Sequence, residues 1–425
     1  MVMKSIRKEL SPGVFFNYVH ATKFKTGLLS AQLVVPLDAE QTAAGALLPA
    51  VLRRGTARHG DMLALSRALD RLYGAGLSFT VRKKGENQCF GFLASFIDDR
   101  LALGGEKLLE PAAELLGEVL LRPATDGGVF RCDYVDGEKD NLIDAIRSIL
   151  DDKRDYAGKR LIEEMCRGER YGIPRLGTED AVAALDGAVL WDFYQRTLMT
   201  ARVELFYCGS AELDRVDDAL RRGVAALPHG ERVLPAASVR VAAPETPREF
   251  SETMDVTQGK LSMGWRAATE DSHAMMLANL IFGGYSNSKL FLNVREKLSL
   301  CYYASSGFHR SKGIVTVSSG VDFADEQRAR TEILAQLASV QRGEIEPWEL
   351  EGAKGVLFSA VRSREDSGTR MEENLLGQAA TGLWESDEEL IAALDAVTPE
   401  RVAAAARSMT LDTVYFLKGE EQAND

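Results

Sequence analysis

The sequence lacks the long apolar segments that a membrane-spanning helix requires. Its most apolar window, residues 45–52, is too short to cross a bilayer. The first residues, MVMKSIRKELSPG, carry charges without the apolar stretch of an export signal behind them. We therefore expect neither export nor an association with membranes.

Cysteine and histidine are both scarce. The five cysteines, Cys89, Cys132, Cys166, Cys208 and Cys301, are odd in number, widely spaced and never in a C-x-x-C pair. This pattern argues against a disulfide framework or a zinc knuckle and is typical of a reducing compartment. The five histidines form no His-x-x-x-His pair. We expect a cytoplasmic protein whose histidines do not hold a metal.

Basic residues are fewer than acidic residues. Lys plus Arg is 51 against 63 for Asp plus Glu, so the net charge is −12. This balance argues against sequence-independent binding of nucleic acid. With 45% hydrophobic and 27% charged residues, the composition is that of a globular protein. A chain of 425 residues predicts two domains.

A proline-rich stretch divides the chain almost in half. Residues 227–249, LPHGERVLPAASVRVAAPETPRE, hold four of the twelve prolines and no sustained helical or strand period, which is typical of a linker. Strands, helices, further strands and a helix-rich tail follow in similar order on each side. We predict an α+β fold with two homologous domains, 1–226 and 250–425, each a mostly antiparallel sheet covered by helices.

Hydrophobic periodicity predicts the elements within each half. In the first half they are a helix at 61–73, strands at 76–84 and 88–96, a helix at 106–121 and a helix or helix pair at 136–166. In the second half they are a strand at 259–266, a helix at 272–282, a hairpin of 299–308 and 314–321, and a helix at 325–342. The last helix places Ala329, Ile333, Leu337 and Val340 on one apolar stripe.

An ordered motif lies in the second half. Residues 281–306 read IFGGYSNSKLFLNVREKLSLCYYASS, with GG, S-K-L-F, V-R-E-K and L-x-Y in this order. The segment resembles the C-domain signature of the pitrilysin/insulinase metallopeptidases. Residues 170–198, in which Thr178 can cap a helix, and residues 203–210 extend the resemblance to nearly the whole chain. In that family the Arg of V-R-E-K and the Tyr seven residues later reach the zinc domain, which implies this role for Arg295 and Tyr302.

The chemistry of zinc-assisted amide hydrolysis explains why an arginine and a tyrosine suit this position. Negative charge builds on the scissile oxygen, and a phenol or guanidinium can meet it with charge-assisted hydrogen bonds. The resemblance implies that Tyr302 is the oxyanion donor and that Arg295 anchors substrate carbonyls. The structural alternative is that Arg295 closes a helix with a salt bridge while Tyr302 packs under a sheet.

The zinc motif of the family is missing. Catalytic members carry H-x-x-E-H on a helix, with two ligands and a general base, shortly before G-T. Counted back from Gly55-Thr56, those positions here read Ala46-Leu47-Leu48-Pro49-Ala50. Glu138 lies where the third ligand is expected, and we interpret it as a surface carboxylate. We expect no metal or cofactor in this chain.

The resemblance predicts one subunit of a two-subunit peptidase. Family members of this length pair as half shells around a chamber, so each subunit would be a half-clamshell. A zinc-bearing homologous subunit would supply the metal, and this chain would supply Arg295 and Tyr302 to a peptide or small unfolded protein. Residues 23–43 and 47–56 further resemble a zinc-less bacterial branch that includes elongation-factor-P modification-associated proteins.

Two other functions remain open. The chain can be a catalytically inactive pseudopeptidase that acts as a peptide-binding or scaffold subunit, in which a sheet edge captures extended chains. It can also be an independent hydrolase with Cys301 as nucleophile, although no sequence pattern nearby supplies a base. The acidic pairs Asp151/Asp152 and Glu163/Glu164 are interpreted as a solvated helix face.

Overall fold

A computed structural model describes residues 5–419, which form two compact units. The first unit comprises the described residues up to Arg147 together with Ile173–Ala237 and Arg364–Trp384. The second comprises Ser148–Gly172, Ser238–Ser363 and the described residues from Glu385 onward. Each unit thus contains one helical segment from the other half of the sequence. The assignment of 1–226 and 250–425 as homologous domains stays a prediction.

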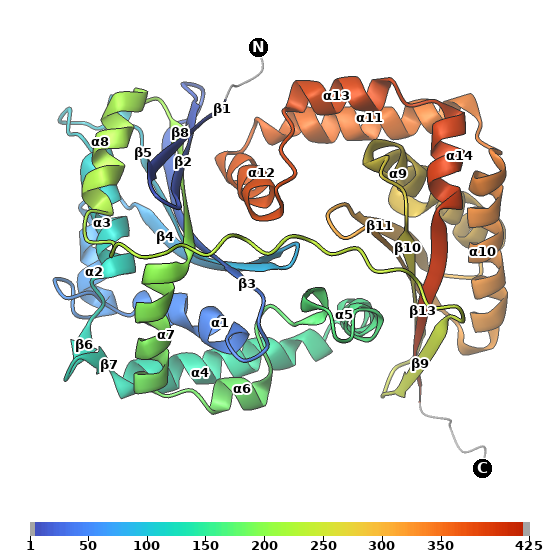
Figure 1. Ribbon diagram of the computed structural model, residues 1–425, viewed down its shortest axis with the longest axis horizontal. Helices are drawn as coiled ribbons and strands as arrows, with labels where there is room; N and C mark the ends of the chain where they lie inside the picture. Colours follow the sequence, from blue (N-terminus) through green and yellow to red (C-terminus); the bar gives the residue numbers. More distant parts are fainter. Residues whose placement is uncertain (1–4, 420–425) are drawn as a thin grey trace. The chain divides into compact units, whose positions relative to one another are not determined.

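The first unit is built on a six-stranded sheet with the order β1-β2-β8-β3-β5-β4 (Figure 1). Its strands are β1 (Ser5–Ser11), β2 (Val14–His20), β3 (Thr26–Pro36), β4 (Gly76–Lys84), β5 (Asn87–Ile97) and β8 (Arg202–Gly209). Only the β2–β8 pair among these neighbours is parallel. Strands β3 and β5 are nearly continuous apolar runs because both of their faces are buried.

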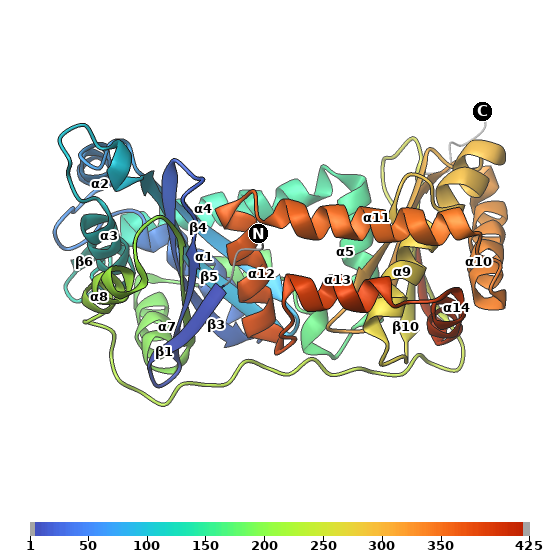
Figure 2. The ribbon, with the colours of Figure 1, turned by 90° about the horizontal axis from the view of Figure 1, so that it is seen from above.

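Helices cover both faces of the first sheet. They are α1 (Thr42–Leu52), α2 (Met62–Asp70), α3 (Leu109–Leu121), α4 (Cys132–Arg147), α6 (Glu179–Ala183), α7 (Gly187–Thr200), α8 (Leu213–Gly223) and α12 (Gly368–Thr381), beside a small hairpin of β6 (Thr125–Asp126) and β7 (Val129–Phe130). Helices α1, α3, α7 and α8 share one core with the sheet. Helix α12 packs on the opposite face through Met371 and Leu376 (Figure 2).

The second unit is built on a five-stranded sheet with the order β11-β12-β10-β13-β9. Its strands are β9 (Arg248–Thr253), β10 (Gly259–Ala267), β11 (Tyr303–His309), β12 (Ile314–Val321) and β13 (Met409–Lys418). Only the β13–β9 pair among these neighbours is parallel. Alternate β10 residues, Leu261, Met263 and Trp265, face the main core of this unit.

Helices also cover both faces of the second sheet. They are α5 (Lys153–Met165), α9 (Ser272–Asn279), α10 (Glu326–Arg342), α11 (Pro347–Arg364), α13 (Asp387–Asp395) and α14 (Pro399–Arg407). The main core lies under α9, α10 and α14. Helix α5 packs on the other face (Figures 1 and 2), where Gly264 leaves room for Met165. A Cβ at Gly264 would lie 2.6 Å from the Met165 sulfur, so a larger residue there would displace this side chain.

The fold class is confirmed, because each unit pairs a mostly antiparallel sheet with covering helices. Several predicted boundaries differ from those of the structure. The linker ends earlier, since β9 begins at Arg248, and the strand predicted from residue 299 begins at Tyr303. Ser299 has a left-handed φ of 51°, which breaks an extended run. Among residues 5–419, every helix is too short or too polar to span a bilayer. The half-clamshell shape stays a prediction.

Candidate functional site

The position of the missing zinc motif is a buried apolar helix. Every residue of α1 is buried, and Pro49 lies inside the helix. Ala46 and Ala50, where the family has its histidine ligands, are 3% and 8% exposed. Neither methyl group can bind a metal, and Pro49 offers no base to activate water. The residues here therefore do not fit zinc.

The position of the third zinc ligand is also changed. Arg54 donates from Nε to Oε1 of Glu138 at 2.5 Å, and its guanidinium lies 5.9 Å from the ring centre of Tyr134. The Glu138 side chain is only 13% exposed, so its interpretation as a surface carboxylate was wrong. A guanidinium on this carboxylate disfavours a divalent cation by charge repulsion. In the described part of the chain, no cluster of His, Cys, Asp or Glu could hold a metal ion.

The Gly55-Thr56 pair after α1 has a structural role. The buried Thr56 hydroxyl donates to Glu118 on α3, and His59 Nδ1 lies 3.0 Å from the same carboxylate oxygen. The His59 amide donates to the Thr56 hydroxyl at 2.8 Å. These bonds fix the loop of residues 55–60 against α3. The sequence indicated the G-T pair but not its partner.

The ordered motif of the second unit forms an unusual helical segment. Helix α9 continues into a π-helical turn, Leu280–Gly284, and a second π-helix covers Leu290–Lys297. Such turns are rare and frequently occur at functional sites. Lys289 of S-K-L-F forms an ion pair of 3.0 Å with the buried Glu349, so this motif residue anchors the start of α11.

Arg295 lies in the last turn of the second π-helix. Its guanidinium stacks 4.7 Å from the ring centre of Phe291 and approaches the exposed Glu296 at 3.6 Å. The side chain remains 41% exposed. A contact this long with an exposed carboxylate restrains the guanidinium weakly, which leaves its donors accessible.

Tyr302 immediately precedes β11. Its amide donates to the Gly320 carbonyl at 2.9 Å, and its hydroxyl donates to Asp322 at 3.4 Å. The residue is 62% exposed, so the alternative that it packs under a sheet is wrong. Among the hydrogen bonds and ion pairs of residues 5–419, none joins Tyr302 to Arg295. The roles of the two residues stay predictions. The sequence had given no signal for Asp322.

Cys301 is a poor nucleophile. It is 7% exposed, and burial raises the pKa of its thiol even though Ser319 and Arg295 favour the thiolate. A neutral thiol at physiological pH is weakly reactive. The structure therefore favours a packing role for Cys301. The acidic pairs have structural partners as well, since Asp152 caps α5 and Glu164 forms an ion pair with Arg160.

Comparisons with known proteins agree with this geometry. A family model described as "Peptidase M16 inactive domain" matches residues 184–357. The Bacillus subtilis (strain 168) protein named "Probable inactive metalloprotease YmfF" is 33% identical over 417 residues, which cover 97% of each chain.

Solved structures share the fold. The crystal structure of a conserved protein from Enterococcus faecalis V583 superimposes with a TM-score of 0.90 at 28% identity, covering 99% of this chain and 100% of that chain. That of a peptidase M16 inactive domain from Pseudomonas fluorescens gives a TM-score of 0.79 at 19% identity, covering both chains completely, and shows the fold alone. With a homologue named as a probable inactive metalloprotease matched along almost its entire length, the chain belongs to the M16, or pitrilysin, peptidase family and to its inactive-domain type.

Proposed function

We propose that this chain is a catalytically inactive M16 homologue that acts as a polypeptide-binding or scaffold subunit. The observation that carries the proposal is the buried, apolar α1 with Arg54 bound to Glu138, which removes both the ligands and the free carboxylate of a zinc site. The name of the Bacillus subtilis relative supports inactivity.

Polypeptide binding is assigned to the segment that ends at Tyr302. Arg295 and Tyr302 are exposed donors on one short segment of the second unit, and donors of this kind suit the carbonyl oxygens of an extended chain. The long hydrogen bond from Tyr302 to Asp322 is easily exchanged for one to a peptide.

The test has two parts. Elemental analysis of the purified chain should find no stoichiometric zinc, and one tightly bound zinc with chelator-sensitive proteolysis would refute inactivity. Fluorescence anisotropy should show binding of a labelled unstructured peptide. Arg295→Ala should weaken that binding about tenfold through loss of a charged hydrogen bond. Lys297→Ala removes an exposed cation from the same turn and is the matched control. Equal effects of both variants would remove Arg295 from the binding surface.

The second candidate function is catalysis in a heterodimer, and the exposure of Tyr302 supports it. In a heterodimer with a zinc-bearing homologous subunit, Tyr302 would donate to the oxygen on which negative charge develops, and Arg295 would hold substrate carbonyls. Tyr302→Phe should then lower turnover of the reconstituted pair about a hundredfold while assembly is unchanged. If Tyr302→Phe leaves turnover unchanged, the catalytic role is excluded and the binding or scaffold function remains. The partner, the cytoplasmic location and the elongation-factor-P branch stay predictions.

A further inference from the structure

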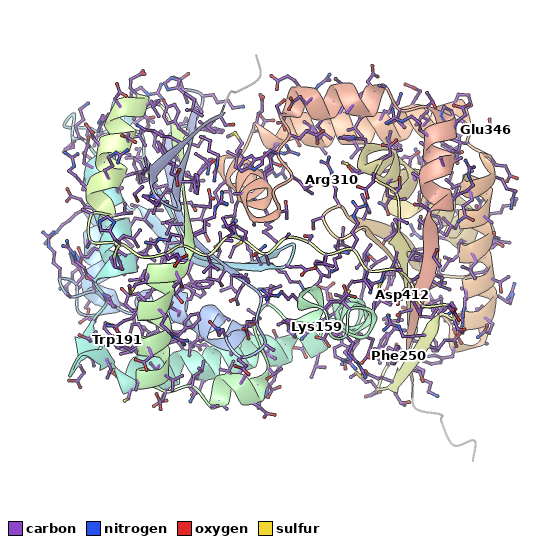
Figure 3. All side chains as sticks on the ribbon, viewed as in Figure 1. Lys159, Trp191, Phe250, Arg310, Glu346 and Asp412 are labelled. Atoms are coloured by element: carbon purple, nitrogen blue, oxygen red, sulfur yellow. The ribbon has the colours of Figure 1, made fainter. Side chains whose placement is uncertain are left out.

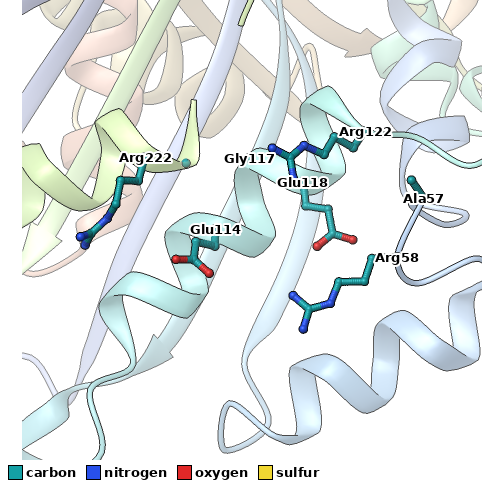
Figure 4. Close-up of a pocket in the computed structure, with 8 residues that line it drawn as sticks. Ala57, Arg58, Glu114, Gly117, Glu118, Arg122 and Arg222 are labelled. Carbon is teal, nitrogen blue, oxygen red and sulfur yellow. The ribbon is translucent and has the colours of Figure 1, made fainter. Parts of the chain in front are cut away.

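A pocket of about 400 Å³ lies in the first unit, on residues that the proposed function does not use (Figure 4). It is formed by the loop of residues 55–60, the second half of α3 and the end of α8. Its lining residues are Ala57, Arg58, Glu114, Gly117, Glu118, Arg122, Arg222 and Gly223.

Two of the lining residues, Gly117 and Gly223, lie where helices α3 and α8 cross closely. A Cβ at Gly117 would lie 1.9 Å from the Gly223 carbonyl oxygen, and a Cβ at Gly223 would lie 2.6 Å from the Ala113 carbonyl oxygen. The backbones of α3 and α8 therefore touch at glycine, which fixes their spacing. The helices that line the pocket are thus held at a fixed spacing, and the larger side chains of the lining extend from them and from the loop.

Three arginines from three different elements line the pocket. Arg58 comes from the loop, Arg122 follows α3, and Arg222 lies in the last turn of α8. Within residues 5–419, none of these three side chains makes a hydrogen bond or an ion pair. Arg222 adds only a long-range attraction to Glu110, whose oxygens bind Arg215. A chain with a net charge of −12 gathers three unpaired cations here.

The carboxylates of the pocket do not neutralise these cations. Glu118 lies between Arg58 and Arg122 in Figure 4, yet it is bound by Thr56 and His59 instead. Glu114 is the other lining carboxylate, and it makes no ion pair among the described residues. Three guanidiniums and one carboxylate of the lining therefore have no hydrogen-bond or ion-pair partner among the described residues, and Figure 4 shows the Arg222 side chain directed away from Arg58 and Arg122.

Helix dipoles account for part of this arrangement. Cations are favoured at helix C-termini, which explains Arg122 and Arg222 without a ligand. Arg58 lies on a loop and has no such partner. We propose that the pocket binds a phosphate-type anion through the side chains of Arg58, on the loop, and Arg122, after α3. A phosphate group has enough oxygens to accept hydrogen bonds from two guanidiniums at once, whereas the two oxygens of a carboxylate match one guanidinium.

Isothermal titration of the full chain at low salt tests the proposal, with inorganic pyrophosphate as the probe. We expect saturable binding that weakens as the salt concentration rises, because the arginines are exposed. Arg58→Gln should weaken it about tenfold, as expected for loss of one charged hydrogen bond. Arg67→Gln on α2 removes an exposed arginine outside the pocket and should change the affinity less than about twofold.

Two results would overturn the assignment. One is the absence of binding at millimolar pyrophosphate, or equal weakening by Arg58→Gln and Arg67→Gln. The other is binding of citrate as tight as that of pyrophosphate, which would make the site a general one for carboxylates. Circular dichroism of Arg58→Gln should match that of the unaltered chain, because the Arg58 side chain makes no hydrogen bond or ion pair with the residues that the structure describes. The outcome is independent of polypeptide binding at Arg295 and Tyr302.

Discussion

The two units each hold one helix from the other half of the sequence, and they hold it with different electrostatics. In the first unit, Glu372 of α12 is 1% exposed and receives two hydrogen bonds from Arg82, at 2.6 and 2.8 Å, and one from Ser30. This is a single buried ion pair, and α12 adds a more exposed one of 2.8 Å between Lys84 and Glu373. The buried pair stabilises the unit only while both partners are present.

In the second unit, the buried charged side chains form a network of ion pairs. Asp412 on β13, labelled in Figure 3, accepts hydrogen bonds from Arg248 and Arg266. Glu169, which follows α5, forms ion pairs of 2.6 Å with Arg266 and 2.7 Å with Lys312, whose side chain is fully buried. Each carboxylate thus serves two cations. The comparison teaches that α12 has one buried ion pair, beside the more exposed pair of Lys84 with Glu373, whereas α5 depends on a shared set in which each member affects several others.

The largest effect is expected where the network is densest. Asp412→Ala leaves two guanidiniums beside each other in a buried site, so the free energy of unfolding should fall by about 3–5 kcal/mol. Urea denaturation gives this value, and hydrogen exchange of α5 peptides should show where protection is lost. Glu249→Ala removes an exposed ion-pair partner and is the control, with a loss below about 1 kcal/mol. Equal losses for the two variants would refute the network.

A somewhat smaller effect is expected in the first unit. Glu372→Ala should lower the free energy of unfolding by about 3 kcal/mol and expose α12 to hydrogen exchange, because Arg82 is left without its partner. The double variant Arg82→Leu/Glu372→Leu should recover most of this loss, since no buried charge remains unpaired. A double variant that is as unstable as Glu372→Ala would contradict the view that the loss comes from an unpaired buried charge at Arg82.

Lowering the pH should decrease the stability of the second unit by a smaller amount than these substitutions. Burial alone would raise the pKa values of Glu169 and Asp412, but hydrogen bonds from Arg266 and its neighbours outweigh this effect and hold both below their ordinary values of 4.5 and 3.8. Their stabilisation is therefore complete above about pH 4.5 and is lost as the pH falls through the lowered pKa values. The protection of α5 amides, measured relative to their intrinsic exchange rates, should fall below this pH, and Asp412→Asn should flatten the dependence. An unchanged profile in that variant would exclude Asp412 as a source.

The smallest effect is expected at the end of the α12 segment. The Trp384 ring lies 4.6 Å from the guanidinium of Arg7, which itself stacks 4.4 Å from the ring centre of Phe15. Since Trp384 is half exposed, Trp384→Ala should cost about 0.5–1 kcal/mol. Thermal unfolding measures the change. Trp348→Ala, an exposed tryptophan of the second unit, is the comparison, and α5 should be unaffected by either.

Much of the local structure could be predicted from the sequence because its causes are local. Residues 76–84 alternate as a strand and form β4 with those bounds, and the predicted stripe of α10, from Ala329 to Val340, is buried. Thr178 caps α6 as expected. The π-helical turns at 280–284 and 290–297 were missed because no period of the sequence distinguishes them from an α-helix.

The partners of buried charges could not be predicted. Glu372 and Lys312 have the sequence surroundings of exposed residues, and only the long-range packing of α12 and α5 buries them. In the candidate site, too, the sequence identified the residues of a motif but not the partners of charged side chains. Its motif identified Arg295 and Tyr302, while the ion pair of Arg54 with Glu138 joins residues 84 positions apart. Sequence spacing does not reveal such a pair.

Helix α1 has a consequence for the history of this chain. A return to metal catalysis needs a histidine at Ala46 and at Ala50, a glutamate at Pro49, and the release of Glu138 from Arg54. Each step taken alone places an unpartnered polar group in a packed core, or leaves one there, which costs stability before any activity appears. Selection acting on one substitution at a time therefore cannot readily retrace this path. The packed α1 is therefore a structural barrier to a zinc site at these positions, since several substitutions would have to occur together.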